Sequence, residues 1–130
     1  MSAPVHRLSE RVALVVDDND LVCHMTARIL TTAGIRTLKA YDAGQALGLL
    51  ADLGADVIGL VVSDVAMPGI TGDELAAIIA ERWPGLPVLL LSAHGHPGAD
   101  YQGSFLAKPF QPDTLLALVS QLAPAFSTAL

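Results

Sequence analysis

The chain has 130 residues, of which 52% are hydrophobic and 15% are charged. This composition predicts a single compact globular domain and excludes an intrinsically disordered chain. The formal net charge of −6 argues against direct binding of nucleic acid, which requires a basic surface.

No apolar run reaches the roughly 18 residues that a membrane-spanning helix needs, and residues 1–11 lack the apolar stretch of a secretory signal. The single cysteine, Cys23, excludes a disulfide within the chain, and its sequence context indicates an inert position on a buried helix face. We therefore expect a cytoplasmic protein with no membrane contact.

Strand-like apolar runs alternate with helical patterns along the whole chain. We expect strands at residues 11–16, 35–40, 56–63, 87–91 and 103–107, and helices at residues 20–33, 42–53, 72–82 and 112–122. This alternation predicts right-handed crossovers and an α/β fold, in which helices cover both faces of a parallel sheet.

The first helix is expected to have Asp20 as its N-cap, and Asp42 is the expected N-cap of the second. Apolar residues at helical spacing predict the buried face of the first helix. That face is expected to contain Leu21, Met25, Ile29 and Leu30.

Residues 93–102 contain Gly95, Pro97 and Gly98, which oppose helix formation, so we expect a single helical turn there at most. His94 and His96 are expected to be solvated surface side chains, because no third metal ligand is near them in the sequence. Residues 1–9 are expected to form a flexible N-terminus, residues 10–123 the domain, and residues 124–130 a C-terminal tail.

Polar side chains stand where four of the expected strands end. Asp17 and Asp18 follow the first strand, Asp64 the third, Ser92 the fourth and Lys108 the fifth. Because the carboxyl ends of parallel strands meet in one crevice, these side chains are expected to lie together. Three carboxylates beside a hydroxyl and an ammonium suit a hard cation and a phosphoryl group.

Four short motifs carry these residues: VVDD at 15–18, SDVAMPG at 63–69, LSA at 91–93 and LAKPF at 106–110. In this order the chain resembles a response-regulator receiver domain, the phosphoacceptor module of two-component signalling, from about residue 11 to residue 122. The resemblance implies a flavodoxin-like (βα)5 three-layer sandwich. Its five-stranded parallel sheet is expected in the order 2-1-3-4-5, with a shortened fourth helix.

The resemblance further implies that Asp64 receives a phosphoryl group from a histidine kinase or a histidine phosphotransfer protein. Mg²⁺, which Mn²⁺ can replace, is the expected cofactor. Its expected ligands are the carboxylates of Asp17, Asp18 and Asp64 and the backbone carbonyl of Ala66.

Further residues are expected to bind the phosphoryl group or to report its presence. Lys108 is expected to pair with Asp64 and then with a phosphoryl oxygen, and Ser92 and the backbone N–H of Ala93 are expected to donate to that group. Phe105 occupies the position of the family's switch aromatic residue. The bond between Lys108 and Pro109 is a candidate for a cis peptide.

Two other functions remain open at this point. One is a receiver-like docking module that acts without phosphorylation, and the other is a haloacid-dehalogenase-like phosphatase, suggested by Asp18-Asn19-Asp20. The favoured receiver function is that of a monomeric phosphoacceptor with autodephosphorylation and not of a turnover enzyme. The domain could stand alone or belong to a larger chain such as a hybrid histidine kinase.

Overall fold

A computed structural model describes residues 11–98 and 100–127 of the chain; the expected N-terminal segment 1–9 lies outside these residues. The elements are β1 (Val12–Val16), α1 (Asp20–Thr32), β2 (Thr37–Ala40), α2 (Ala43–Leu53), β3 (Ile58–Asp64), α3 (Gly72–Arg82), β4 (Val88–Ser92), β5 (Ser104–Ala107), α4 (Pro112–Leu122) and α5 (Pro124–Ser127). The strands form one parallel sheet in the order β2-β1-β3-β4-β5. The expected strand order is therefore confirmed.

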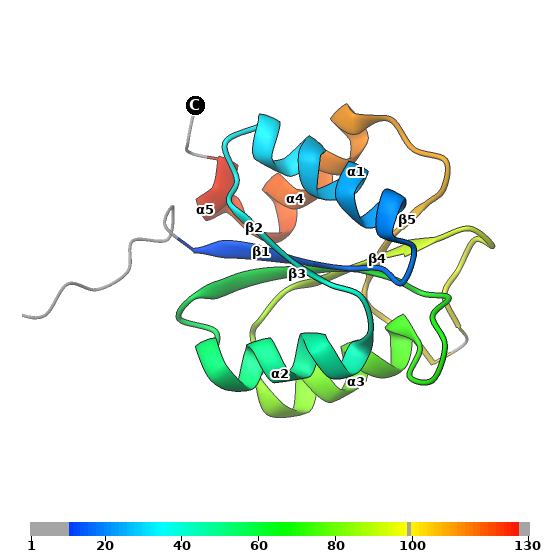
Figure 1. Ribbon diagram of the computed structural model, residues 1–130. Helices are drawn as coiled ribbons and strands as arrows, with labels where there is room; N and C mark the ends of the chain where they lie inside the picture. Colours follow the sequence, from blue (N-terminus) through cyan, green and yellow to red (C-terminus); the bar gives the residue numbers. More distant parts are fainter. Residues whose placement is uncertain (1–10, 99, 128–130) are drawn as a thin grey trace, which may run out of the picture.

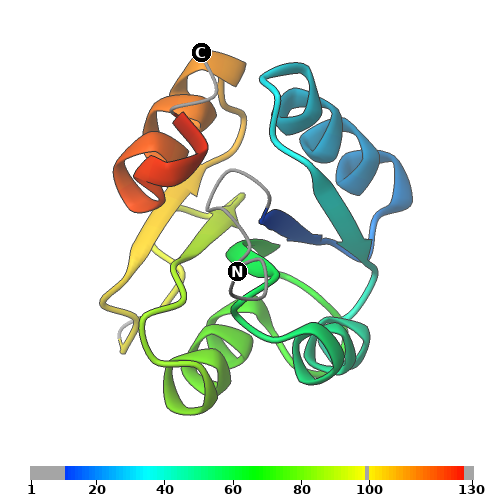
Figure 2. The ribbon, with the colours of Figure 1, turned by 90° about the vertical axis from the view of Figure 1, so that its left-hand side faces the viewer.

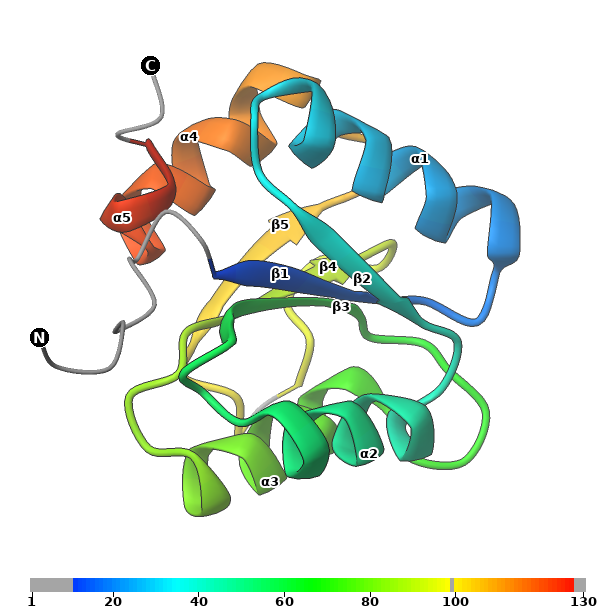
Figure 3. The same cartoon turned by 60° about the vertical axis from the view of Figure 1, so that its left-hand side comes forward.

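Helices cover the sheet on both faces (Figure 1). Viewed along the sheet, α1 and α4 lie on one side and α2 and α3 on the other (Figure 2), and α5 lies beside α4 (Figure 3). Strands covered on both faces are expected to be apolar throughout. All five residues of β1 and all but one of β3 are buried, whereas the edge strands β2 and β5 are more exposed.

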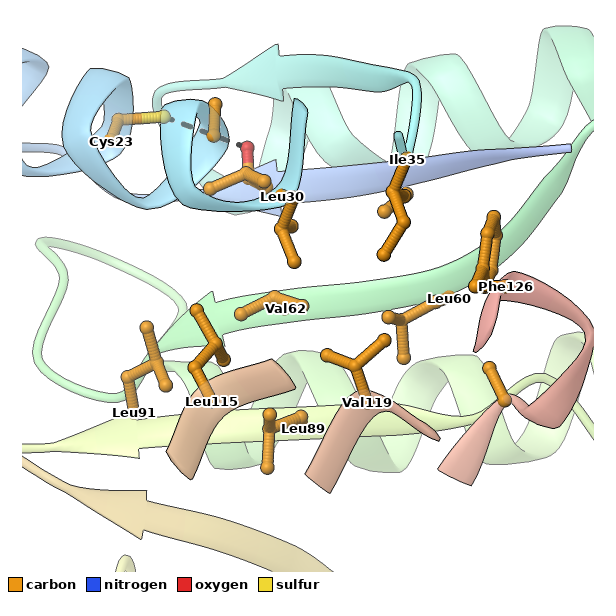
Figure 4. Packing of buried hydrophobic residues seen from close by; sticks show 14 residues of the cluster. Cys23, Leu30, Ile35, Leu60, Val62, Leu89, Leu91, Leu115, Val119 and Phe126 are labelled. Atoms are coloured by element: carbon orange, nitrogen blue, oxygen red, sulfur yellow. Dashed lines mark hydrogen bonds between the residues drawn. The ribbon is translucent and has the colours of Figure 1, made fainter. Parts of the chain in front are cut away.

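Two apolar clusters, one on each face of the sheet, hold the layers together. The first joins the sheet to α1, α4 and α5 and includes Cys23, Leu30, Leu115 and Val119 (Figure 4). The second joins the sheet to α2 and α3 and includes Leu50, Leu75 and Ile79. Burial of this apolar surface is the main force that stabilises the fold.

Helix α1 differs from the sequence-based expectation in its cap and in its buried face. Its N-cap is Asn19, whose Oδ1 accepts a hydrogen bond from the Val22 N–H at 3.1 Å, so Asp20 lies inside the first turn instead. Leu21 and Met25, expected to be buried, are 68% and 57% exposed. The buried residues of α1 are Cys23, Thr26, Ala27 and Leu30.

Residues 93–98 and 100–103, which link β4 to β5, contain turns and bends and no helix. The fourth helix, expected to be shortened to one turn at most, is therefore missing from the described part of this link. Gly95, with a φ of 79°, adopts a left-handed backbone conformation that an α-helix does not contain. The next helix in the chain is α4, after β5.

The C-terminal tail expected from residue 124 is ordered at its start, because Pro124–Ser127 forms the short helix α5. Phe126 is only 5% exposed and belongs to the first apolar cluster (Figure 4). Its ring lies over Gly59 of β3, where a Cβ atom would stand 3.3 Å from Phe126 Cζ. The folded unit therefore extends at least to Phe126, beyond the expected boundary at residue 123.

Among residues 11–98 and 100–127, no helix combines the length and the apolar character that crossing a membrane would require.

Candidate functional site

The site lies at the carboxyl edge of the sheet, where β1, β3, β4 and β5 end side by side. In Figure 3 the loops that follow β1 and β3 leave the sheet at the same end. Backbone hydrogen bonds continue past the strand ends: Asp17 N–H donates to the Ala40 carbonyl at 3.1 Å, and Lys108 N–H to the Ser92 carbonyl at 2.8 Å. These bonds fix the backbone from which the site side chains project.

Three carboxylates meet at this edge, as the sequence predicts. Asp17, Asp18 and Asp64 each offer one oxygen, and these oxygens lie within 4.8 Å of one another. Asp17 and Asp64 are buried, whereas Asp18 is exposed. Hard cations such as Mg²⁺ are bound by carboxylate oxygens in this kind of arrangement.

Lys108 is the cation of the site. Its Nζ donates to Asp64 Oδ1 at 2.9 Å, and it lies 3.7 Å from Asp17 Oδ2. The peptide bond between Lys108 and Pro109 is cis, as the sequence suggested. One ammonium thus faces three carboxylates, and the site keeps an excess of negative charge.

The protein does not fully compensate this negative charge at Asp17. Its Oδ1 accepts the Asn19 N–H at 2.9 Å, but its Oδ2 is buried without a hydrogen-bond partner. Burial raises the pKa of the Asp17 carboxyl, and the Asp64 charge raises it further, against the opposing effects of the Asn19 N–H and Lys108. A buried, unsatisfied carboxylate oxygen beside two further carboxylates fits a site for a bound cation.

The loop after β3 is folded tightly against the end of that strand. Val65 N–H donates to the Leu91 carbonyl at 3.0 Å, and Gly72 N–H to the Val65 carbonyl at 2.8 Å. A Cβ atom on Gly72 would lie 2.1 Å from the Asp64 carbonyl oxygen, so only glycine fits. This close approach sets the path of the loop that carries Ala66, and the motif alone did not reveal it.

Ser92 and Phe105 lie on the neighbouring strands. Ser92 is 3% exposed, and its Oγ accepts the His94 N–H at 3.3 Å. Phe105 is half-buried, and its ring packs edge-on against the His96 ring with centroids 5.1 Å apart. His94 and His96 are exposed, as expected, but the contact of His96 with Phe105 was not predicted.

Comparison with known proteins identifies the family. The sequence profile of the response regulator receiver domain matches residues 13–120. The response regulator protein FleR of Pseudomonas aeruginosa is 37% identical over 122 residues, which cover 89% of this chain and 25% of FleR. The DNA-binding transcriptional regulator NtrC of Klebsiella pneumoniae is 34% identical over 116 residues, which cover 85% of this chain and 24% of NtrC.

Solved structures give the same result. The receiver domain of NtrX from Brucella abortus has a TM-score of 0.73 and 31% identity, with 90% of this chain and 99% of that chain covered. The receiver domain of the hybrid histidine kinase CckA has a TM-score of 0.72 and 34% identity, with 85% and 97% covered. This chain spans about a quarter of the length of FleR and NtrC. From the profile match, the sequence relatives and the sheet order together, the chain belongs to the response-regulator receiver domain family.

Proposed function

We propose that this domain accepts a phosphoryl group on Asp64 from a phosphorylated histidine of a kinase or phosphotransfer protein. The observation that carries this proposal is the position of Asp64. It ends the central strand β3, lies within 4.8 Å of the Asp17 and Asp18 carboxylates, and is held by Lys108 at 2.9 Å. Family membership also argues against the phosphatase alternative.

The reaction is a displacement at phosphorus. An Asp64 carboxylate oxygen attacks, the P–N bond of the phosphohistidine breaks, and the imidazole leaves with the bonding electron pair. Asp17, Asp18 and Asp64, with the Ala66 carbonyl oxygen, would hold Mg²⁺, which supplies charge neutralisation at the phosphoryl oxygens when bound. The orphaned Oδ2 of Asp17 supports this ligand set.

The remaining residues bind the transferred group and respond to it. Lys108 Nζ can exchange its bond to Asp64 Oδ1 for a bond to a phosphoryl oxygen. The Ser92 hydroxyl and the Ala93 N–H are the proposed donors on the neighbouring strand end. The half-buried Phe105, in contact with the His96 ring, is the proposed aromatic switch.

The donor has to dock beside this site, and α1 supplies a surface for it. Leu21 and Met25 are 68% and 57% exposed near the start of the helix that follows Asp17 and Asp18. Exposed large apolar side chains next to a reactive group are typical of a protein contact surface. They support a protein donor more than a small-molecule donor alone.

The direct test is phosphorylation of an Asp64→Asn variant, with Asp52→Asn, an exposed α2 carboxylate, as the matched control. Both variants are treated with acetyl phosphate in Mg²⁺. Hydroxylamine-sensitive labelling is expected for the wild type and the control and is expected to be absent from Asp64→Asn. Undiminished labelling of Asp64→Asn would contradict the assignment of Asp64 as the phosphoryl acceptor. If the wild type is not labelled, the phosphorylation-independent docking module is favoured.

A second measurement tests the protein donor. Met25→Lys is expected to slow transfer from a phosphorylated histidine phosphotransfer protein by about tenfold, equivalent to the loss of about 1.4 kcal/mol of contact energy, and to leave labelling by acetyl phosphate unchanged. Leu53→Lys, at a 38% exposed position at the end of α2, is the control. Equal slowing in both variants would contradict a donor surface on α1.

A further inference from the structure

A groove opens where the sheet lacks a helix. The link between β4 and β5 contains no helix in its described residues, so α2 and α3 alone cover that face of the sheet (Figure 2). Strand β5, although paired with β4, has no fully buried residue. Between α3 and residues 100–103 lies a groove of about 480 Å³.

The inner surface of the groove is apolar. Small side chains on α3, among them Ala77 and Ala80, form one wall, and the half-buried Leu86, which precedes β4, and Val88, its first residue, also line the groove. The volume falls within the range of about 300–1,000 Å³ that is typical of binding pockets. A surface of this shape and composition suits apolar side chains of a partner.

Tyr101 forms the opposite wall of the groove, and hydrogen bonds hold it in place before any partner binds. Its hydroxyl donates to the Ser104 carbonyl, and its N–H donates to the Gly98 carbonyl at 3.1 Å. The ring occupies the space beside Gly103, where a Cβ atom would stand 2.5 Å from the Tyr101 hydroxyl oxygen. The wall therefore does not have to form during binding, which lowers the entropic cost of binding.

The rim of the groove is acidic. Asp73 and Glu74, in the first turn of α3, and Asp100, in the link, contribute carboxylates, and none of the described residues that line the groove is Lys, Arg or His. Like charges facing each other across an interface are destabilising, and opposite charges favour encounter and orientation. Because the chain carries a net charge of −6, a second copy of it is a poor electrostatic match for this rim.

We propose that this groove docks an amphipathic helix of a partner protein, with apolar side chains in the groove and Lys or Arg side chains facing Asp73, Glu74 and Asp100. A helix fits because a three-layer α/β fold normally has a helix over this part of the sheet. Amphipathic helices bind such grooves through one apolar face. None of the site residues lines the groove, and the wall residue Tyr101 is in edge contact with His96, which also packs against Phe105.

The test uses a fluorescein-labelled peptide of about 14 residues, a length at which helices begin to be stable. The peptide contains only Leu, Ala and Lys, with its apolar residues on one helical face, and a matched peptide carries Glu in place of Lys. Binding to the full chain is followed by fluorescence anisotropy. Ala77→Lys places bulk and positive charge in the groove, and Ala51→Lys makes the same change at an exposed position of α2.

The Lys peptide is expected to bind the wild type and Ala51→Lys equally well, and to bind Ala77→Lys at least about tenfold more weakly. The Glu peptide is expected to bind at least tenfold more weakly than the Lys peptide. Asp100→Asn, which changes only the rim, is expected to weaken the Lys peptide about two- to threefold. It provides a second measurement if Ala77→Lys fails to fold by circular dichroism.

Three results would overturn the proposal. The wild type could fail to bind the Lys peptide, the two Ala→Lys variants could bind it equally weakly, or the two peptides could bind equally well. Equal weakening in both variants would mean that the peptide responds to the net charge of the chain and not to the groove.

Discussion

Replacement of Asp17 by Asn is expected to stabilise the metal-free protein. Asn keeps an oxygen that can accept the Asn19 N–H, but it removes a buried negative charge whose Oδ2 has no hydrogen-bond partner. Burial raises the pKa of this carboxyl, so folding disfavours its charged form. The wild type tolerates this cost because the same charge is the proposed cation ligand.

The magnitude follows from the distances. Two charges within 4.8 Å, as for Asp17 and Asp64, repel by about 3.5 kcal/mol at an effective dielectric constant near 20. Lys108 Nζ, 3.7 Å from Asp17 Oδ2, attracts by about 4.5 kcal/mol on the same basis. These two terms nearly cancel, and repulsion by the Asp18 carboxylate, which also lies within 4.8 Å but is exposed and therefore more screened, decides the sign against the Asp17 charge. Because the asparagine removes this net repulsion but leaves an amide N–H group at the buried position of Oδ2, we expect a gain of about 1–2 kcal/mol.

Urea denaturation in EDTA near neutral pH measures this difference, with Asp52→Asn as the control for loss of an exposed carboxylate. The pKa of Asp17 is raised above its ordinary value of 3.8, so its cost is present above the folded-state pKa. The cost disappears as the pH falls through that pKa. The advantage of Asp17→Asn should therefore shrink as the pH falls from neutral toward 3.8.

Mg²⁺ is expected to reverse the order of stability. A ligand at 100 times its dissociation constant stabilises the folded state by about 2.7 kcal/mol, and the variant has lost one of the proposed ligands. If Asp17→Asn is instead less stable than the wild type in EDTA, attraction to Lys108 dominates the site and the reasoning fails.

Three further predictions concern the loop after β3, the C-terminal helix and the oligomeric state. Gly72→Ala is expected to destabilise the protein by about 1–3 kcal/mol because of the clash with the Asp64 carbonyl. Gly48→Ala, in open space on α2, should instead stabilise it by about 0.5–1 kcal/mol. Urea denaturation of both variants tests this, and equal changes in their free energies of unfolding would contradict it. Phe126→Ala is expected to cost about 3–5 kcal/mol, and a loss below 1 kcal/mol in the same assay would mean that α5 does not hold the core. Because residues 93–98 and 100–103 between β4 and β5 form no helix that could build a two-fold interface, the protein should be a monomer with and without beryllofluoride by light scattering. A tight dimer in the activated form alone would contradict this.

Much of the fold was determined by local sequence patterns. Continuous apolar runs predicted β1, β3 and β4, and helical spacing gave α3 and α4 with their observed bounds. Asp42 was correctly predicted as the N-cap of α2, where its carboxylate accepts the Gln45 N–H at 2.7 Å. These features are local because capping and periodicity involve residues a few positions apart. The meeting of Asp17, Asp18, Asp64 and Lys108 also followed from sequence, because parallel strand ends share one edge.

Tertiary packing decided the features that local patterns left ambiguous. The apolar residues of α1 allow more than one buried face, and the sheet contacts Cys23 and Ala27 while Leu21 and Met25 stay exposed. Each step along a helix turns the side chain by about 100°, so a small rotation exchanges buried and exposed positions. Spacing could not distinguish these rotations, because only the surface against which the helix packs selects one.

The details of the site also needed distant residues to come together. The sequence predicted that Lys108 pairs with Asp64, but not that its Nζ also lies near Asp17 or that Asp17 Oδ2 remains unsatisfied. Neither the burial of Phe126 over Gly59 nor the groove beside Tyr101 has a local signature, since each joins segments far apart in the chain. The residue types that can perform the chemistry were therefore determined by the sequence. Their distances, their burial and the uncovered part of the sheet were decided by tertiary structure, because these depend on packing between elements.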